Sequence, residues 1–202
     1  DIIFMCFCVY ALYFCLKRFK EISFRNIFLF SLFSAFATSI RVLGVLFFFL
    51  FIFFILLYAL EKKEFLKNNY NKIFLYLISY PCFLYMFWPF LWESPFENFI
   101  VAFKSFANYD WGGEIFYLGD YMKATNLPWH YIPVWIYISM PILIFLFFII
   151  GLINILNKFI NNFLNLSNKN SLWVKNIELM DFIVMSFFFF PLFAIILFNS
   201  TL

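Results

Sequence analysis

Residues 26–60 read NIFLFSLFSAFATSIRVLGVLFFFLFIFFILLYAL, and this stretch decides the fold. It is too long for one helix across a hydrocarbon core, which about 20 apolar residues span. Its only charged residue is Arg41, and Gly44 follows shortly after. An Arg in the middle of a bilayer costs at least about 2.5 kcal/mol, whereas at an interface it costs little. The stretch therefore predicts two spans, 26–41 and 43–60, that meet near Arg41.

The composition of the whole chain is that of an integral membrane protein. Of its 202 residues, 66% are hydrophobic and 12% are charged, which lies outside the range of soluble domains. We therefore expect one all-α, polytopic membrane domain over residues 1–202. The length criterion predicts about six transmembrane helices, at 2–17, 26–41, 43–60, 72–91, 132–156 and 180–198. The connecting loops are then 18–25, 61–71, 92–131 and 157–179.

The distribution of basic residues predicts which side of the membrane each loop faces. Eleven of the 14 Lys and Arg residues lie in or beside the loops 18–25, 61–71 and 157–179. The other three are Arg41, Lys104 and Lys123. Because cytoplasmic loops carry the excess of Lys and Arg, these three loops are expected to be cytoplasmic. The loop 92–131 is then extracytoplasmic.

The predicted extracytoplasmic loop, 92–131, differs in composition from the rest of the chain. It holds five of the 11 acids, the only His and three of the five Gly, and its net charge of −3 does not favour nucleic acid as a partner. Residues 95–103 have apolar side chains near helical spacing, and Ser94 can cap them, so we expect a short amphipathic helix in the interface. Residues 115–118 are expected to form a short extended or helical piece that Gly119 ends.

Each polar candidate residue has a structural and a functional interpretation, and the residues alone leave both open. Arg41 either extends to lipid headgroups or binds an anion such as phosphate, for which a guanidinium is well suited. His130 either anchors a helix start within an interfacial aromatic belt or takes part in catalysis or substrate orientation. The acids of the loop are either solvated or functional; they include Asp110, Glu114 and Asp120. No His/Cys spacing predicts a metal site or a bound cofactor.

Several motifs resemble those of a known family. They are SAFATSIRVLG at 34–44, FYLG at 116–119, LPWHYIPVW at 127–135, SMP at 139–141 and the closing FNSTL at 198–202. Together they resemble the middle and later membrane region of polyprenyl-phosphate-dependent glycosyltransferases with the GT-C fold. These enzymes are bacterial relatives of the dolichyl-phosphate-mannose protein mannosyltransferases and the aminoarabinose transferases.

The resemblance implies an enzyme of the bacterial inner membrane, with membrane lipid as its surroundings. The enzyme would move a sugar from a polyprenyl-phosphate donor to a lipid, glycan or protein acceptor at the extracytoplasmic face. Glu114 and His130 become the catalytic candidates. Candidates for substrate binding are Arg41, Asp110, Asp120, Trp129 and Tyr131. The acidic catalytic loop that the family carries near its N-terminus has no match here, so the sequence is expected to be a fragment that is inactive alone.

Two other classes of function remain alternatives. Part of a transporter or channel would use Arg41 and the acidic loop as a gate or vestibule, but the predicted spans show no internal repeat. A non-catalytic membrane scaffold would use the outer loop to bind a partner. An acidic first loop upstream would favour the transferase, whereas inverted repetition of the spans would favour a transporter.

Overall fold

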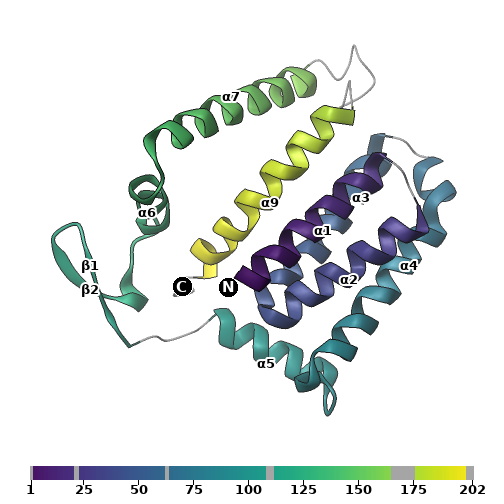
Figure 1. The fold of residues 1–202 in the computed structure, drawn as a ribbon, viewed down its shortest axis with the longest axis horizontal. Helices are drawn as coiled ribbons and strands as arrows, with labels where there is room; N and C mark the ends of the chain where they lie inside the picture. Colours follow the sequence, from purple (N-terminus) through teal and green to yellow (C-terminus); the bar gives the residue numbers. More distant parts are fainter. Residues whose placement is uncertain (1, 21–22, 62–63, 108–111, 165–175, 199–202) are drawn as a thin grey trace.

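The structure, a computed structural model, describes residues 2–20, 23–61, 64–107, 112–164 and 176–198, and these are almost entirely helical (Figure 1). The first elements are α1 (Ile2–Lys20), α2 (Phe24–Ile40), the 3-10 helix η1 (Val42–Val45), α3 (Leu46–Glu61), α4 (Glu64–Phe87), η2 (Pro89–Leu91) and α5 (Pro95–Ala107). The later ones are β1 (Glu114–Tyr117), β2 (Asp120–Lys123), η3 (Ala124–Asn126), α6 (Tyr131–Ser139), α7 (Ile142–Leu164) and α9 (Asn176–Phe198). The predicted all-α class is confirmed.

Two helices of the described chain are long and apolar enough to cross a membrane. They are Ile142–Leu164 and Ile177–Ile196. The apolar parts of α1, α2 and α3 are shorter, at Ile2–Lys17, Phe24–Ile40 and Val42–Leu57. The six spans therefore remain a prediction, although a helix covers most of each predicted segment.

The predicted break at Arg41 is confirmed as an interruption of the helix. α2 ends at Ile40, and Arg41 has extended backbone angles, φ −140° and ψ 128°. Its N–H donates to the carbonyl of Ala37 at 3.0 Å, and its own carbonyl accepts from Gly44 at 2.8 Å. These two bonds satisfy backbone groups that a helix end leaves without intrahelical partners.

The core lies where α2 packs between α1 and α4. Three fully buried rings form its centre: Tyr76 of α4 lies 5.0 Å from Phe30 of α2 and 3.9 Å from Phe51 of α3, measured between ring centroids. α9 closes the bundle, since it packs against both α1 and α3. Phe187 of α9 lies 4.8 Å from Phe47 of α3. The bundle thus joins the two ends of the sequence.

The structure divides the predicted span 132–156 into two helices, α6 and α7. α6 ends at Ser139, and Met140 has extended angles, φ −87° and ψ 137°. The cause is Pro141, whose ring disfavours helical angles at the residue before it and which has no N–H for the helix ladder. The segment therefore turns between the two helices (Figure 1).

The predicted connecting loops 61–71 and 157–179 are too long. α4 already begins at Glu64, and α7 continues to Leu164. Polar Lys and Asn residues at these positions continue the helices past their apolar parts, and hydropathy alone does not distinguish such an extension from a loop. At its other end α4 stops at Phe87, before the predicted limit of 91, because Pro89 disfavours helix at Trp88.

A compact corner sets the direction of α5. The indole of Trp92 donates to the carbonyl of Tyr85 at 2.7 Å, and the Asn98 amide donates to the carbonyl of Phe90 at 2.6 Å. These bonds tie the end of α4 to the start of α5, which then packs against η1. The predicted amphipathic helix is confirmed, and it begins at Pro95 as expected.

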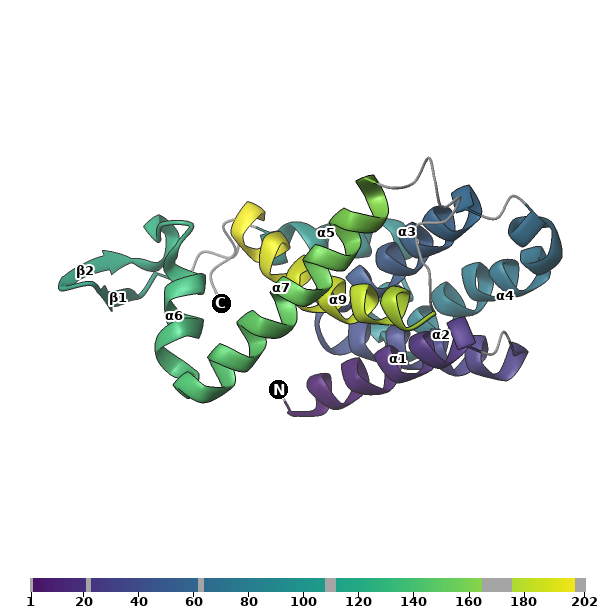
Figure 2. The same cartoon turned by 90° about the horizontal axis from the view of Figure 1, so that it is seen from above.

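The helix ends gather at two opposite ends of the molecule (Figure 1). One end holds the C-termini of α1, α3 and α7 and the N-termini of α2, α4 and α9. The other holds the start of α1, the turn between α2 and η1, α5 and the end of α9. The β1–β2 hairpin and α6 extend beyond the bundle in both views (Figures 1 and 2).

Candidate functional site

The turn at Arg41 is held by a close approach between two segments of backbone. A Cβ atom added to Gly44 would lie 2.5 Å from the backbone nitrogen of Thr38 and 2.6 Å from the carbonyl carbon of Ala37. Only glycine therefore fits where η1 folds back on the last turn of α2. The guanidinium of Arg41, an exposed residue, lies 6.0 Å from the ring centroid of Phe4, within cation–π range. Arg41 thus sits beside the first helix, at the end of the bundle that also carries α5.

Residues 115–118 were expected to be a short extended or helical piece, and the structure places most of them in strand β1 of the β1–β2 hairpin. The two strands pair antiparallel, with Glu114 opposite Lys123 and Tyr117 opposite Asp120. The two turn residues have positive φ angles, 52° at Leu118 and 103° at Gly119. This is the pattern of the tight turn that matches strand twist, in which Asn-Gly is the usual pair. Leu118 is therefore strained, and its side chain is 73% exposed.

The hairpin separates the two catalytic candidates. Residues directly opposite in an antiparallel pair share a face, and neighbours along a strand alternate between faces. Glu114 thus shares a face with Phe116 and its partner Tyr121, whose rings are 5.1 Å apart. The other face carries Tyr117, which contacts His130. Glu114 therefore lies on the hairpin face opposite to the one that carries Tyr117, the contact of His130.

His130 belongs to an aromatic cluster at the base of the hairpin. Its ring centroid lies 5.8 Å from that of Tyr117 and 5.6 Å from that of Trp129, and Tyr131 contacts Tyr117 at 5.1 Å. We call Tyr117, Trp129, His130 and Tyr131 the outer aromatic cluster. Asp120 lies on the same hairpin face, opposite Tyr117. Of the predicted residues, the structure thus brings together Trp129, His130 and Tyr131, while Asp120 pairs with Tyr117 across the hairpin.

Tyr117 is the member of this cluster that the sequence did not single out. It is buried, and its hydroxyl is enclosed without a hydrogen-bond partner in the described protein. A buried unpaired hydroxyl costs about 1–3 kcal/mol, and it marks a position where water or a polar ligand group would be favourable. The only signal in the sequence was that Tyr117 directly follows Phe116, so that in a strand the two rings would point to opposite faces.

Of the predicted site residues that the structure describes, Arg41 and Glu114 lie apart from the outer aromatic cluster. The end of α2, which Arg41 follows, lies apart from the β1–β2 hairpin in both views (Figures 1 and 2). Asp110 lies outside the residues that the structure describes.

A row of hydroxyl groups between α2 and α4 was not anticipated. The hydroxyl of Thr38 lies 2.8 Å from that of Tyr80, and Ser79 donates to the Ser31 hydroxyl, also at 2.8 Å. Ser34 and Tyr76 approach each other to 3.5 Å. All of these side chains are buried, and they form a polar seam of the kind that joins helices within membranes. We assign this seam to packing, because each hydroxyl has a protein partner.

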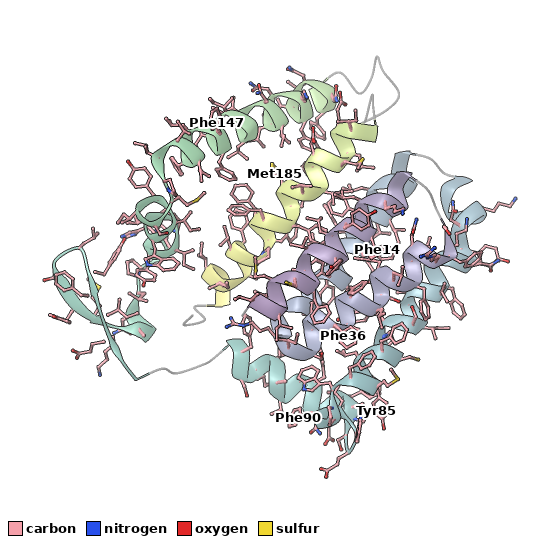
Figure 3. All side chains as sticks on the ribbon, viewed as in Figure 1. Phe14, Phe36, Tyr85, Phe90, Phe147 and Met185 are labelled. Atoms are coloured by element: carbon pink, nitrogen blue, oxygen red, sulfur yellow. The ribbon has the colours of Figure 1, made fainter. Side chains whose placement is uncertain are left out.

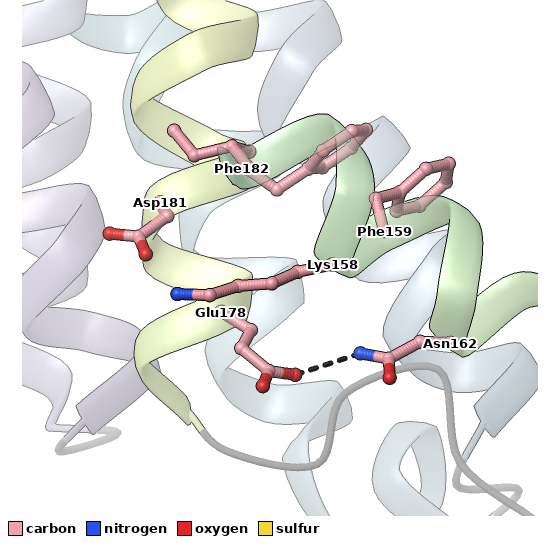
Figure 4. Close-up of a pocket in the computed structure, with 7 residues that line it drawn as sticks. Lys158, Phe159, Asn162, Glu178, Asp181 and Phe182 are labelled. Carbon is pink, nitrogen blue, oxygen red and sulfur yellow. Dashed lines mark hydrogen bonds between the residues drawn. The ribbon is translucent and has the colours of Figure 1, made fainter. Parts of the chain in front are cut away.

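A second polar cluster joins α7 to α9 (Figure 4). The amide of Asn162 donates to a carboxylate oxygen of Glu178 at 2.9 Å, and Lys158 extends between Glu178 and Asp181 (Figure 4). The cavity beside them is about 10 Å³, room for about one water molecule. Phe159 and Phe182 stack at 4.7 Å and line it on one side. In the described chain no group of three or more His, Cys, Asp or Glu residues could hold a metal ion.

Comparisons with protein-family models, with curated proteins and with solved structures find no match to the chain. The resemblance to glycosyltransferases therefore rests on its motifs alone.

Proposed function

We propose that the chain is a multi-pass membrane glycosyltransferase of the bacterial inner membrane. It takes a sugar from a polyprenyl-phosphate donor and transfers it to a lipid, glycan or protein acceptor at the extracytoplasmic face. The observation that carries the proposal is that four polar or aromatic parts of the molecule lie away from the end of the bundle where basic residues flank the α1–α2 junction. These parts are the Arg41 turn, α5, the hairpin and the outer aromatic cluster.

The orientation in the membrane is the first step of the proposal. Exposed Lys17 and Arg25 lie near the junction of α1 and α2, and the Lys72 ammonium lies 5.7 Å from the ring of Phe24. The junction of α1 and α2 lies at one end of the bundle (Figure 1), so these basic residues mark that end. By the positive-inside rule this end is cytoplasmic. The Arg41 turn and α5 then lie at the outer surface.

The second step assigns roles to the outer residues. The Arg41 guanidinium, at the level of the lipid headgroups, is suited to the phosphate that leaves when the sugar is transferred. The outer aromatic cluster offers exposed Trp129 as a stacking surface for a sugar ring. His130, half-buried beside it, is the better placed of the two catalytic candidates to move a proton, with Asp120 on the same hairpin face.

A transfer assay in membranes that contain the full-length protein tests these roles. Arg41→Ala and His130→Ala are each expected to lower the rate about 100-fold, the usual contribution of a charge-stabilising or proton-transferring group. Glu114→Gln is expected to retain most activity because it faces away from His130, and Lys123→Gln is the matched charge control. Wild-type rates in both Arg41→Ala and His130→Ala would remove these residues from the site.

Cysteine labelling tests the orientation separately from activity. In a background without the four native cysteines, Glu114→Cys is expected to react with a membrane-impermeant reagent from outside. Lys158→Cys is expected to react only after the membrane is opened. Labelling of position 114 from the cytosol alone would show that the hairpin faces the cytoplasm, and it would contradict the proposed function.

A partner-binding scaffold is the second candidate, and the tip of the hairpin favours it. Phe116, Leu118 and Tyr121 are 62%, 73% and 74% exposed and stand together at the end of the hairpin. Apolar side chains displayed on a projecting turn are typical of interaction sites. Loss of partner capture in Phe116→Ser, with transfer activity absent from the wild type, would favour this function.

A further inference from the structure

A groove lies between the start of α3 and the outer helix α5. Its volume is about 450 Å³, within the range of ligand sites in proteins. The lining residues are Val45, Phe49, Phe99, Ile100, Phe103 and Lys104. Five of the six lining side chains are thus apolar, and Lys104 is the exception.

The groove itself is apolar, and the one charged residue at its wall is Lys104. Lys104 lies in the last turn of α5, the amphipathic helix at the proposed outer surface. Phe49 and Ile100 are 58% and 52% exposed, so the groove opens to the side rather than enclosing its occupant. Arg41 directly precedes η1, which supplies Val45 to the wall. A lipid with its hydrocarbon chain along these rings and its anionic headgroup at Lys104 matches this arrangement.

We propose that this groove binds an anionic glycerophospholipid, with one acyl chain along Phe49 and Phe103 and the headgroup phosphate at Lys104. The open shape suits a lipid that exchanges with the bilayer. The compact ammonium of Lys attracts any phosphate without the fixed fork geometry of Arg, which favours a general lipid over a dedicated substrate. The proposal does not depend on glycosyl transfer.

Lipid retention tests the proposal. The protein is incorporated into nanodiscs of equal phosphatidylglycerol and phosphatidylcholine and extracted in mild detergent, and the lipid that copurifies is quantified. Phosphatidylglycerol is expected to be retained about fivefold over phosphatidylcholine, the preference that one basic residue near a membrane surface supplies. Lys104→Gln is expected to abolish the preference, and Lys123→Gln, on the hairpin, to preserve it. Equal retention of the two lipids by the wild type overturns the proposal.

Two further measurements establish where the lipid binds and which class of lipid the groove accepts. Ile100→Trp fills the groove and is expected to lower the retention of both lipids, while Phe96→Trp, on an exposed position of the same helix outside the groove, leaves it unchanged. If undecaprenyl phosphate at equimolar concentration displaces the retained phosphatidylglycerol completely, the groove is a donor site and the phospholipid proposal fails. Partial displacement in proportion to its concentration is the result expected for a general anionic-lipid site.

Discussion

The helices α2 and α7 are both apolar, yet one is buried and the other is exposed. α2 buries eight residues, among them Ser31, Ser34 and Thr38, whereas Asn162 is the only buried residue of α7. Phe36 of α2 stacks on Phe87 at 4.1 Å, but Phe147 of α7 is 66% exposed (Figure 3). The more polar helix is thus the one at the centre.

The reason is that apolarity alone gives helices little cause to associate in lipid. Lipid tails are as apolar as Leu, so close packing of small residues and hydrogen bonds between helices decide which helices meet. α2 supplies Ser, Ala and Thr to its neighbours, and Gly44 lets η1 touch its backbone. α7 has Gly151, but nothing lies within 4 Å of the Cβ position there. We therefore distinguish a bundle half, α1 to α5, from a peripheral half, β1 to α7.

The largest expected difference between the halves is at their glycines. Gly44→Ala places a methyl group 2.5 Å from the Thr38 nitrogen, a backbone atom that cannot move independently, so we expect a loss of about 3 kcal/mol or more in unfolding free energy. Gly151→Ala, with open space around it, is expected to change stability by no more than about 1 kcal/mol. Denaturant unfolding in detergent measures both. Equal losses of unfolding free energy in the two variants would contradict the distinction between a bundle half and a peripheral half.

A smaller effect is expected where the bundle half uses hydrogen bonds. Thr38→Val leaves the buried Tyr80 hydroxyl without its partner and is expected to cost about 1.5 kcal/mol. The double variant with Tyr80→Phe removes both groups and is expected to recover most of that loss. Ser139→Ala, in exposed α6, is the peripheral control and is expected to be close to neutral. A double variant as unstable as the sum of the two single variants would mean that the two hydroxyls do not interact.

The smallest effect is expected in the hairpin, and it has the opposite sign. Leu118→Asn replaces a strained residue at positive φ with one that tolerates this conformation, so the hairpin is expected to gain about 1 kcal/mol. Leu118→Val is expected to weaken it, because branching at Cβ worsens the strain. Protection of the hairpin amides from hydrogen exchange reports both changes. A gain from valine would show that packing, not backbone strain, controls the turn.

Several features were predictable because they depend on local chemistry. The helix break at Arg41 and Gly44, the start of α5 at Pro95 and the turn at Gly119 follow from residues that restrict or free the backbone near them. Pro141 carried the same kind of signal, yet the apolar length of 132–156 concealed the break between α6 and α7. Length and hydropathy describe a segment as a whole, whereas a helix ends at single residues.

The site was predictable as a set of residues but not as an arrangement. Trp129, His130 and Tyr131 are neighbours in sequence, so their proximity required no fold. Tyr117 joins them only because strand alternation turns it inward, and the same alternation turns Glu114 away from His130. Which residues of β1 and β2 share a face depends on the pairing register, and which face meets residues 129–131 depends on tertiary contacts.

The sequence by itself determined that this is an apolar helical chain with one polar segment, because composition, charge distribution and backbone-restricting residues act within a few positions. The tertiary structure decided which helices are central, since that depends on hydroxyl groups such as Thr38 and Tyr80, distant in sequence, meeting at 2.8 Å. It also decided which candidates share a site, because contacts between segments depend on register and crossing geometry, which no local pattern contains.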